Sequence, residues 1–152
     1  MNPFLLSEKE RMLSWRELRN QISALPDDEK FEPLLRWWAK APICAYAIDA
    51  YDCAQWPTPW ELLNENMFCT SAVAYLMAQT LILSGVNEAR IMLTCIKGND
   101  DERLIVVVDD SIVLNYSYGE VFAWADIKDE FVERQSYRFV EAKAIPVNQT
   151  AV

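Results

Sequence analysis

One cysteine of this chain stands where a thiol nucleophile would be expected. Cys69 opens an apolar run of helical character, residues 69–81, and Gly85 follows shortly after that run. The start of a helix favours thiol chemistry, because the helix dipole and the free amide groups stabilise a thiolate. Such a site also needs a base to take the proton, most often a histidine. The chain contains no histidine, so the sequence supplies a nucleophile without its usual base.

The other residue types restrict the remaining chemistry. The four cysteines stand at positions 44, 53, 69 and 95 without CxxC spacing, and no histidine is available for a mixed zinc site. We therefore expect no metal and no cofactor, and we expect Cys44, Cys53 and Cys95 to be core residues. Only three glycines are present, which leaves too few for a glycine-rich phosphate-binding loop.

Composition favours one folded unit that binds neither nucleic acid nor a membrane. Of the 152 residues 52% are hydrophobic, and six Trp, six Tyr and six Phe are enough for a substantial core. The net charge is −9, whereas nucleic-acid binding usually needs a basic patch. Gln79 and Thr80 interrupt the longest apolar run, and the first residues lack the basic start of a signal peptide. We therefore expect a reducing, cytoplasmic environment.

Two helices are expected in the first part of the chain. Ser7 and Glu10 have the spacing of a capping box at the start of a helix over residues 7–24. A second helix should begin at about residue 29 or 33 and end at residue 39. It carries Trp37 and Trp38, whose side chains point about 100° apart on a helix. Either both side chains belong to the core or its rim, or at least one of them contacts a partner.

Two further helices lead to the sheet. Thr58 as N-cap, Pro59 at the first helical position and Glu61 as the capping-box partner predict a short helix over residues 59–63. The helix that Cys69 opens should end before Gly85, which suits a left-handed cap.

The second half of the chain has the pattern of a β-sheet. The apolar run 104–108 predicts a central strand that is buried on both faces. A helical turn is expected at 124–127, and the last eight residues should form a loose tail. Strand-like runs separated by turn residues lie at 89–97, 103–108, 112–118 and 131–144. Turns are expected at 98–101, 109–111 and 118–120. Helices followed by an antiparallel sheet indicate the α+β class.

From Trp56 to about Ala142, the motif order resembles that of the bacterial transglutaminase-like cysteine proteinases, which have a papain-like fold. In that family a Trp-x-Thr-x-x-Glu-like lead-in is followed by a cysteine helix, a strand that starts with histidine and a strand that ends in Leu-Asp-Asn. The matching residues here are Trp56, Thr58, Glu61, Cys69, Ala72, Tyr75, Ser84, Gly85, Val86, the run 104–108, Val113, Leu114, Asn115, Trp124 and the run 137–140. The resemblance implies a Cys-bearing helix packed on an antiparallel sheet.

The departures from this family determine the expected function. Phe68, Thr70 and Ser71 replace the acidic residues beside the family cysteine. The family histidine falls at about Leu104, within one or two residues, and the family aspartate falls at Asn115. General-base assistance, worth about 10²–10⁴-fold, is therefore missing. Cys69 is then a small residue kept for packing, and Asn115 is a strand or turn residue that bonds its own backbone.

The first half of the chain has a second resemblance, to small proteins encoded among tailed-phage virion genes. The motifs that carry it are residues 13–19 with Leu25-Pro26, the pair Trp37-Trp38, residues 56–60 and residues 114–116. The resemblance implies a structural or adaptor protein of a phage tail, baseplate or neck, assembled in the host cytoplasm with other virion proteins. The candidate partner contacts are Trp15, Arg16, Arg19, Arg36, Trp37 and Trp38.

The sequence thus predicts a helical extension over residues 1–55, an inactive transglutaminase-like domain over 56–144 and a tail over 145–152. Two alternatives remain. One is an active cysteine hydrolase whose Cys69 uses Asp109, Asp110 or Glu102 as an atypical base. The other is a small regulatory binding module, such as an inhibitor that mimics a protease surface.

Overall fold

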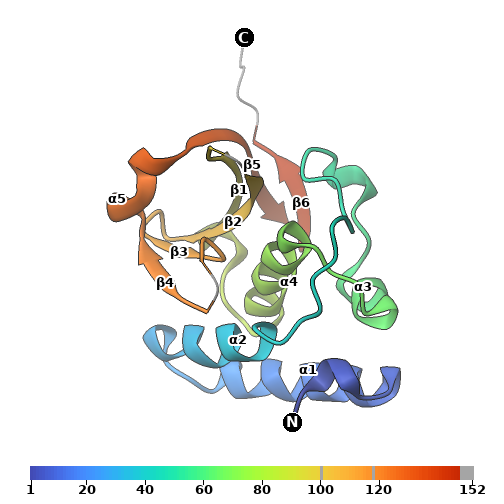
Figure 1. Cartoon of the computed structure of the whole chain (residues 1–152). Coiled ribbons are helices and arrows are strands. Elements are labelled where there is room, and N and C mark those ends of the chain that lie inside the picture. Colours follow the sequence, from blue (N-terminus) through green and yellow to red (C-terminus); the bar gives the residue numbers. More distant parts are fainter. Residues whose placement is uncertain (100, 118, 148–152) are drawn as a thin grey trace.

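The computed structural model describes residues 1–99, 101–117 and 119–147, and in these ranges helices pack on one antiparallel sheet (Figure 1). The α-helices are α1 (Glu8–Ser23), α2 (Phe31–Trp38), α3 (Pro59–Glu65), α4 (Thr70–Leu83) and α5 (Trp124–Ile127). The strands are β1 (Ile91–Lys97), β2 (Glu102–Val108), β3 (Ile112–Leu114), β4 (Val121–Ala123), β5 (Val132–Val140) and β6 (Lys143–Pro146). This order confirms the expected α+β class.

Local capping chemistry sets the helix boundaries that the sequence predicted. The Ser7 hydroxyl accepts a hydrogen bond from the Glu10 amide at the start of α1. Thr58 and Glu61 form the complete capping box of α3, in which each side chain accepts a bond from the other residue's amide. After α4, Gly85 takes φ +105°, a conformation that residues with a Cβ rarely adopt.

Strand β2 lies inside the sheet and is buried on both faces, as the sequence predicted. The strand order is β4-β3-β2-β1-β5-β6 with antiparallel neighbours. Leu104, Val106 and Val108 point into the main core, whereas Ile105 and Val107 point into a second core on the other face. The alternation follows from the two-residue period of a strand.

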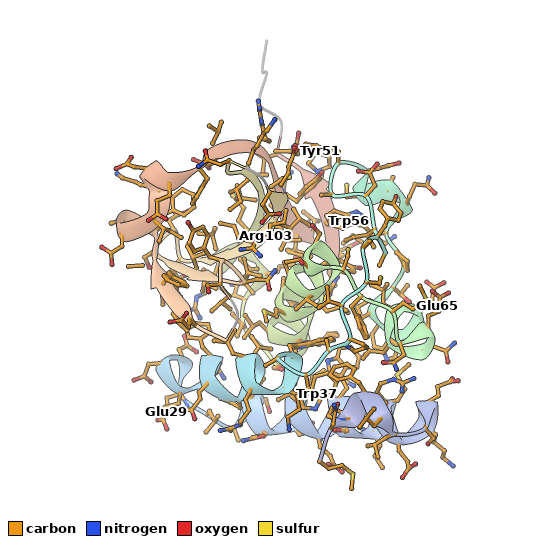
Figure 2. All side chains as sticks on the ribbon, in the orientation of Figure 1. Glu29, Trp37, Tyr51, Trp56, Glu65 and Arg103 are labelled. Carbon is orange, nitrogen blue, oxygen red and sulfur yellow. The ribbon has the colours of Figure 1, made fainter. Side chains whose placement is uncertain are left out.

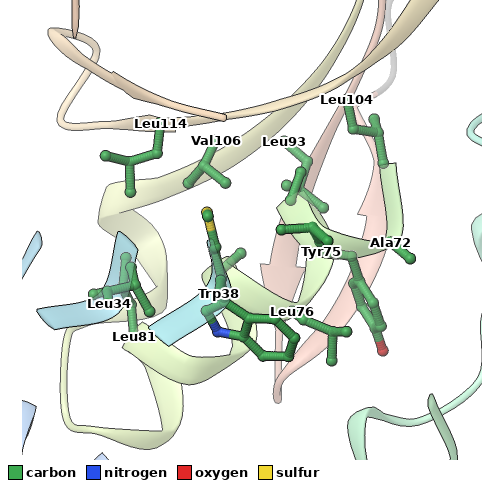
Figure 3. Close-up of a cluster of buried hydrophobic side chains, with 14 of the residues drawn as sticks. Leu34, Trp38, Ala72, Tyr75, Leu76, Leu81, Leu93, Leu104, Val106 and Leu114 are labelled. Atoms are coloured by element: carbon green, nitrogen blue, oxygen red, sulfur yellow. The ribbon is translucent and has the colours of Figure 1, made fainter. Parts of the chain in front are cut away.

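Helix α4 is the centre of the main core. Its residues from Ser71 to Leu81 are all buried, because α4 lies between the sheet on one side and the N-terminal helices on the other (Figure 1). Figure 3 shows side chains from three sources meeting there, with Leu34 and Trp38 from α2, Leu76 from α4, and Val106 and Leu114 from the sheet. The predicted extension over residues 1–55 thus shares one core with the rest of the chain.

The opposite face of the sheet has its own smaller core. Ile96, Ile105, Val107 and Val113 meet Ile127 of α5 there. Trp124 and Phe131 cover this cluster, and their rings lie 5.7 Å apart in an edge-on arrangement. The helical turn expected at 124–127 is therefore confirmed and closes the outer face of the sheet.

Several boundaries differ from the expectations. The strand expected over 112–118 ends at Leu114, because Asn115 turns the chain with φ +68°. Strand β4 was not predicted, and β6 runs through Pro146, two residues into the segment expected to be a tail. Residues 100 and 118, expected in turns, and 148–152 of the tail lie outside the described ranges.

Two of the tryptophans expected to contact a partner lie inside the protein, which corrects that expectation. Trp15 and Trp38 are 0% and 1% exposed. The Trp15 indole N–H donates to the Thr80 hydroxyl at 3.0 Å, and the ring of Trp38 packs edge-on against Phe68, with ring centroids 5.7 Å apart. These two side chains join α1 and α2 to the main core.

The other four candidate contacts lie at or near the surface. Trp37 is half-buried, and its indole N–H donates to the Ser14 hydroxyl at 3.1 Å. Arg19 is also half-buried, with its guanidinium 4.3 Å from the centre of a Trp15 ring, and burial lowers its pKa. Arg16 and Arg36 are exposed. A contact with a partner stays a prediction for these four.

Arg90 joins the N-terminal part of the chain to the end of β2. Its guanidinium contacts Asp27 at 2.6 Å and Asp109 at 2.7 Å.

Arg90→Gln should lower the free energy of unfolding by about 1 kcal/mol or less, because the pairs lie at the surface. Bonding to Arg90 lowers the pKa of Asp109, so this stability is present at neutral pH and is lost as the pH falls through the lowered pKa. Urea unfolding followed by tryptophan fluorescence, repeated from neutral to acidic pH, measures the difference.

Arg16→Gln, at an exposed arginine of α1, is the matched control for Arg90→Gln. It removes the same charge and should leave the unfolding curve nearly unchanged at every pH. A difference between wild type and Arg90→Gln that grows at acidic pH would contradict the assignment of the ion pairs.

Candidate functional site

Cys69 lies at the start of α4, beside the segment that contains Ile43 and Cys44. The residue is the N-cap of α4, with the extended backbone angles φ −103° and ψ 172°. Just before it, Phe68 forms a parallel bridge with Ile43, and the Cys44 amide donates to the Phe68 carbonyl at 2.7 Å. Cys69 is 8% exposed, so the thiol predicted at a helix start is there but is largely covered.

A cavity of about 370 Å³ borders Cys69. Its walls are the start of α4, the segment from Cys44 to Tyr51, and Asp101 with the first two residues of β2. Tyr51 donates a hydrogen bond to the Glu102 carboxylate at its rim. Tyr51 and Arg103 lie in the part of the molecule that faces away from α1 (Figure 2). Glu102 is therefore the acidic candidate that the structure places in the same cavity as Cys69.

Leu104 occupies the strand position beside the start of α4. Its amide donates to the Ser71 hydroxyl at 3.2 Å, and its side chain is 0% exposed in the main core. By strand alternation the neighbours Arg103 and Ile105 point to the opposite face, and Ile105 does lie in the second core. Among these three residues, Leu104 alone faces the Cys69 helix, and it carries no group that accepts a proton.

Asn115 connects the start of α4 to β2. Its side-chain amide donates to the Thr70 carbonyl at 2.9 Å and to the Leu104 carbonyl at 3.3 Å. The structure thus brings the three positions inferred from the family motif together, at the start of α4, on β2 and after β3. It also corrects one expectation: Asn115 bonds the backbone of two distant segments and not its own.

Two of the three candidate bases, Asp109 and Asp110, lie far from Cys69, which corrects the expectation that either could act as its base. Asp109 and Asp110 follow the far end of β2, and at about 3.3 Å per residue they are roughly 20 Å along the strand from Glu102. Both border a separate cavity together with Arg90. Asp109 is ion-paired with Arg90, and both carboxylates border a different cavity from the one beside the Cys69 thiol.

All four cysteines are free thiols with different surroundings. Cys95 is 0% exposed on β1, and burial raises its pKa to about 11. Burial also raises the pKa of the half-buried Cys53. Cys44 is half-buried and borders the Cys69 cavity. The expectation of core cysteines is thus met by Cys69 and Cys95, whereas Cys44 and Cys53 reach the surface in part.

Two features are missing from the ranges that the structure describes. Residues 1–99, 101–117 and 119–147 contain no group of three or more cysteine, aspartate or glutamate side chains placed to hold a metal ion. In the same ranges, the helices are too short or too polar to cross a membrane.

Comparison with known proteins identifies the fold. No protein-family model and no curated protein matches the sequence. Among solved structures, calcium-bound LapG of Legionella pneumophila superposes with a TM-score of 0.74 at 14% identity, covering 88% of this chain and 77% of LapG. A second LapG structure gives 0.72 at 14%, covering 86% and 74%, and an EGTA-treated one gives 0.72 at 12%, covering 93% and 82%.

These identities are low, so the similarity establishes the architecture alone. The element order and the position of the N-terminal helices agree with the α+β fold expected from the motif order. The chain therefore has a transglutaminase-like fold with an N-terminal helical region.

Proposed function

We propose that this protein is a non-catalytic transglutaminase-like domain that acts by binding other proteins. One observation carries the proposal. The β2 residue that faces the start of the Cys69 helix is Leu104, a fully buried apolar side chain. A thiol hydrolase needs a base at this place, and an aliphatic side chain packed into the core cannot act as one.

The surroundings of Leu104 support this proposal. Asn115, at the position of the family aspartate, uses its amide to bond two backbone carbonyls. It is a donor there and fixes the backbone, whereas an orienting carboxylate would accept a bond from an imidazole. With no histidine in the sequence, the site lacks general-base assistance worth about 10²–10⁴-fold.

The alkylation rate of Cys69 tests this proposal. Iodoacetamide at neutral pH should modify Cys69 no faster than free cysteine, because the residue is 8% exposed and has no imidazole beside it. Mass spectrometry assigns each modified thiol, and the buried Cys95 is an internal control that should stay unmodified in the folded protein. Selective modification of Cys69 at a rate above that of free cysteine would overturn the non-catalytic assignment.

An active cysteine hydrolase is the second candidate function, and one observation favours it. Glu102 borders the same cavity as Cys69 and accepts a hydrogen bond from Tyr51. If Glu102 is the base, Glu102→Gln slows the alkylation of Cys69 at neutral pH. Glu133→Gln, at an exposed glutamate of β5, is the matched control and leaves the rate unchanged in either case.

We further propose that the binding role is the assembly of a tailed-phage particle in the host cytoplasm. The support is the resemblance of the N-terminal motifs, together with the exposed Arg16 and Arg36 and the half-buried Arg19 and Trp37 near α1 and α2. The protein should then remain with washed phage particles, and Arg16→Glu with Arg36→Glu should release it while the isolated protein stays folded. Absence from washed particles would contradict a structural role in the virion.

A further inference from the structure

An apolar groove lies beside β4, the strand at one edge of the sheet. Its volume is about 690 Å³. Phe31, Leu35 and Ala39 line it from the α2 side, and Ile112 and Val121 line it from β3 and β4. The core that α2 covers reaches Leu114, which is 0% exposed, whereas Val121 opposite it on β4 is 46% exposed. The helix therefore leaves the last part of this sheet face uncovered.

Strand β4 ends the sheet and offers backbone groups to an additional strand. The Trp124 amide donates to the Ser111 carbonyl at 2.8 Å, which makes these two residues a hydrogen-bonded pair. Because such pairs alternate along an antiparallel ladder, Phe122 bonds to Val113 on β3. The amide and carbonyl of Val121 then point away from β3, toward the side where the sheet ends.

The charges at the rim indicate what kind of segment fits. Asp28 and Glu32 stand on the α2 side of the groove, and both are exposed. Arg36, the basic residue lining the groove, is ion-paired with Glu32 at 3.1 Å. The whole chain also carries a net charge of −9. A second copy would bring like charges together, whereas a basic partner would meet opposite charge.

We propose that this groove binds an extended segment of a partner protein, which adds a strand to β4. Its apolar side chains enter the space between α2 and β4, and lysine or arginine residues beside them face the acidic rim. Pairing through the main chain gives affinity, and the groove selects the side chains. This inference rests on the proposed function of the protein as a binding domain and names the partner chemistry.

A yeast-displayed library of random linear peptides, selected on the full-length protein, tests this inference. Selected peptides should alternate apolar and other residues and carry lysine or arginine next to the apolar positions. In amide hydrogen exchange, the Val121 amide should become protected when a selected peptide is bound. Selection of no peptides, or of peptides without this pattern, would overturn the inference.

Two variants of Val121 separate strand addition from simple apolar contact. Val121→Pro removes the outward amide without removing a bond to β3, a change that edge strands tolerate. It should weaken peptide binding about tenfold, through the lost hydrogen bond and the pyrrolidine ring at the edge. Val121→Thr keeps the amide and a branched side chain, so it should bind nearly as wild type. Equal binding by Val121→Pro, with an unchanged unfolding curve, would contradict the inference.

The rim charges and the competing occupants give the remaining tests. Asp28→Lys should reduce the affinity for basic peptides and its dependence on salt. Self-association that Val121→Pro abolishes in sedimentation would show that a second copy occupies the groove and would overturn the inference. Mass spectrometry of the bound peptide separates failure of the proposed function from failure of the groove. Cleavage of the peptide that depends on Cys69 would contradict the non-catalytic function. Binding of intact peptide away from Val121 would contradict only the groove as the binding site.

Discussion

Replacing Trp15 with alanine is expected to lower the free energy of unfolding by about 3–5 kcal/mol. The indole is 0% exposed and fills the space between α1, α3 and α4. It donates to the Thr80 hydroxyl inside α4 and packs edge-on against Trp60 at 5.6 Å. The substitution removes both contacts and leaves a cavity that the close-packed helices fill only in part. A loss of this size is a large fraction of the 5–15 kcal/mol that stabilises a typical domain.

Urea unfolding followed by far-UV circular dichroism measures this loss without depending on tryptophan fluorescence. Trp15→Phe keeps an aromatic ring and removes the N–H bond to Thr80, so its cost should be smaller than that of alanine. Trp60→Ala is the matched control, since Trp60 is 47% exposed and mainly loses an aromatic pair worth roughly 0.5–1.5 kcal/mol. Equal losses for Trp15→Ala and Trp60→Ala would contradict the packing of α1 against α4.

The burial of Trp15 and Trp38 changes how an interface on the N-terminal helices can be tested. Alanine at either position removes core volume, so a loss of assembly would report unfolding and not a lost contact. Arg16 and Arg36 are exposed and can be changed without removing core volume. The charge-reversal variants proposed for the particle therefore separate binding from stability, which the tryptophan substitutions do not.

The parts of the fold that local chemistry determines could be predicted from the sequence. Ser7 and Thr58 mark helix starts because each caps a free amide three residues later. The alternation of Leu104 to Val108 between two cores follows from a strand with apolar residues on both faces. The resemblance to the transglutaminase-like family, and not residue order alone, implied that the positions of Cys69, Leu104 and Asn115 lie at one site, and hydrogen bonds from Asn115 to Thr70 and Leu104 join these segments.

The parts that depend on distant neighbours could not be predicted. Trp37 and Trp38 are equally apolar, and the pattern does not show that Phe4 folds back to pack against both rings. Strand β4 has three residues, too few for a periodic signal. Asp109 and Glu102 are both acidic residues near β2, and only the direction of that strand shows that Glu102 lies at the Cys69 end.

Replacing Asn115 with alanine is expected to lower the free energy of unfolding by roughly 2–4 kcal/mol. The Thr70 and Leu104 carbonyls each lose a donor, and alanine is strained at φ +68°, a conformation that asparagine tolerates. Asn115→Gly relieves the strain and still loses the bonds, so it should fall between wild type and alanine. If the amide only bonded its own turn, glycine would be as stable as wild type.

Asn115→Asp separates the structural role of this position from the role of the family aspartate. The new carboxyl keeps the shape of the side chain but, when charged, places its oxygens against the Thr70 and Leu104 carbonyls. Its pKa in the folded protein should therefore lie above the unfolded value of about 3.9. The protonated carboxyl can donate to one carbonyl, so stability relative to wild type is best below the unfolded pKa and is lost as the pH rises through the raised pKa.

Urea unfolding of wild type and Asn115→Asp at a series of pH values measures this difference directly. The variant should approach wild type in acid and differ most at neutral pH, whereas Asn115→Ala should show a nearly constant difference. A carboxylate that orients a base is charged at working pH and costs little there. Equal stability of wild type and Asn115→Asp at neutral pH would therefore show that the site still accommodates a catalytic carboxylate, and would weaken the case that this fold serves only for binding.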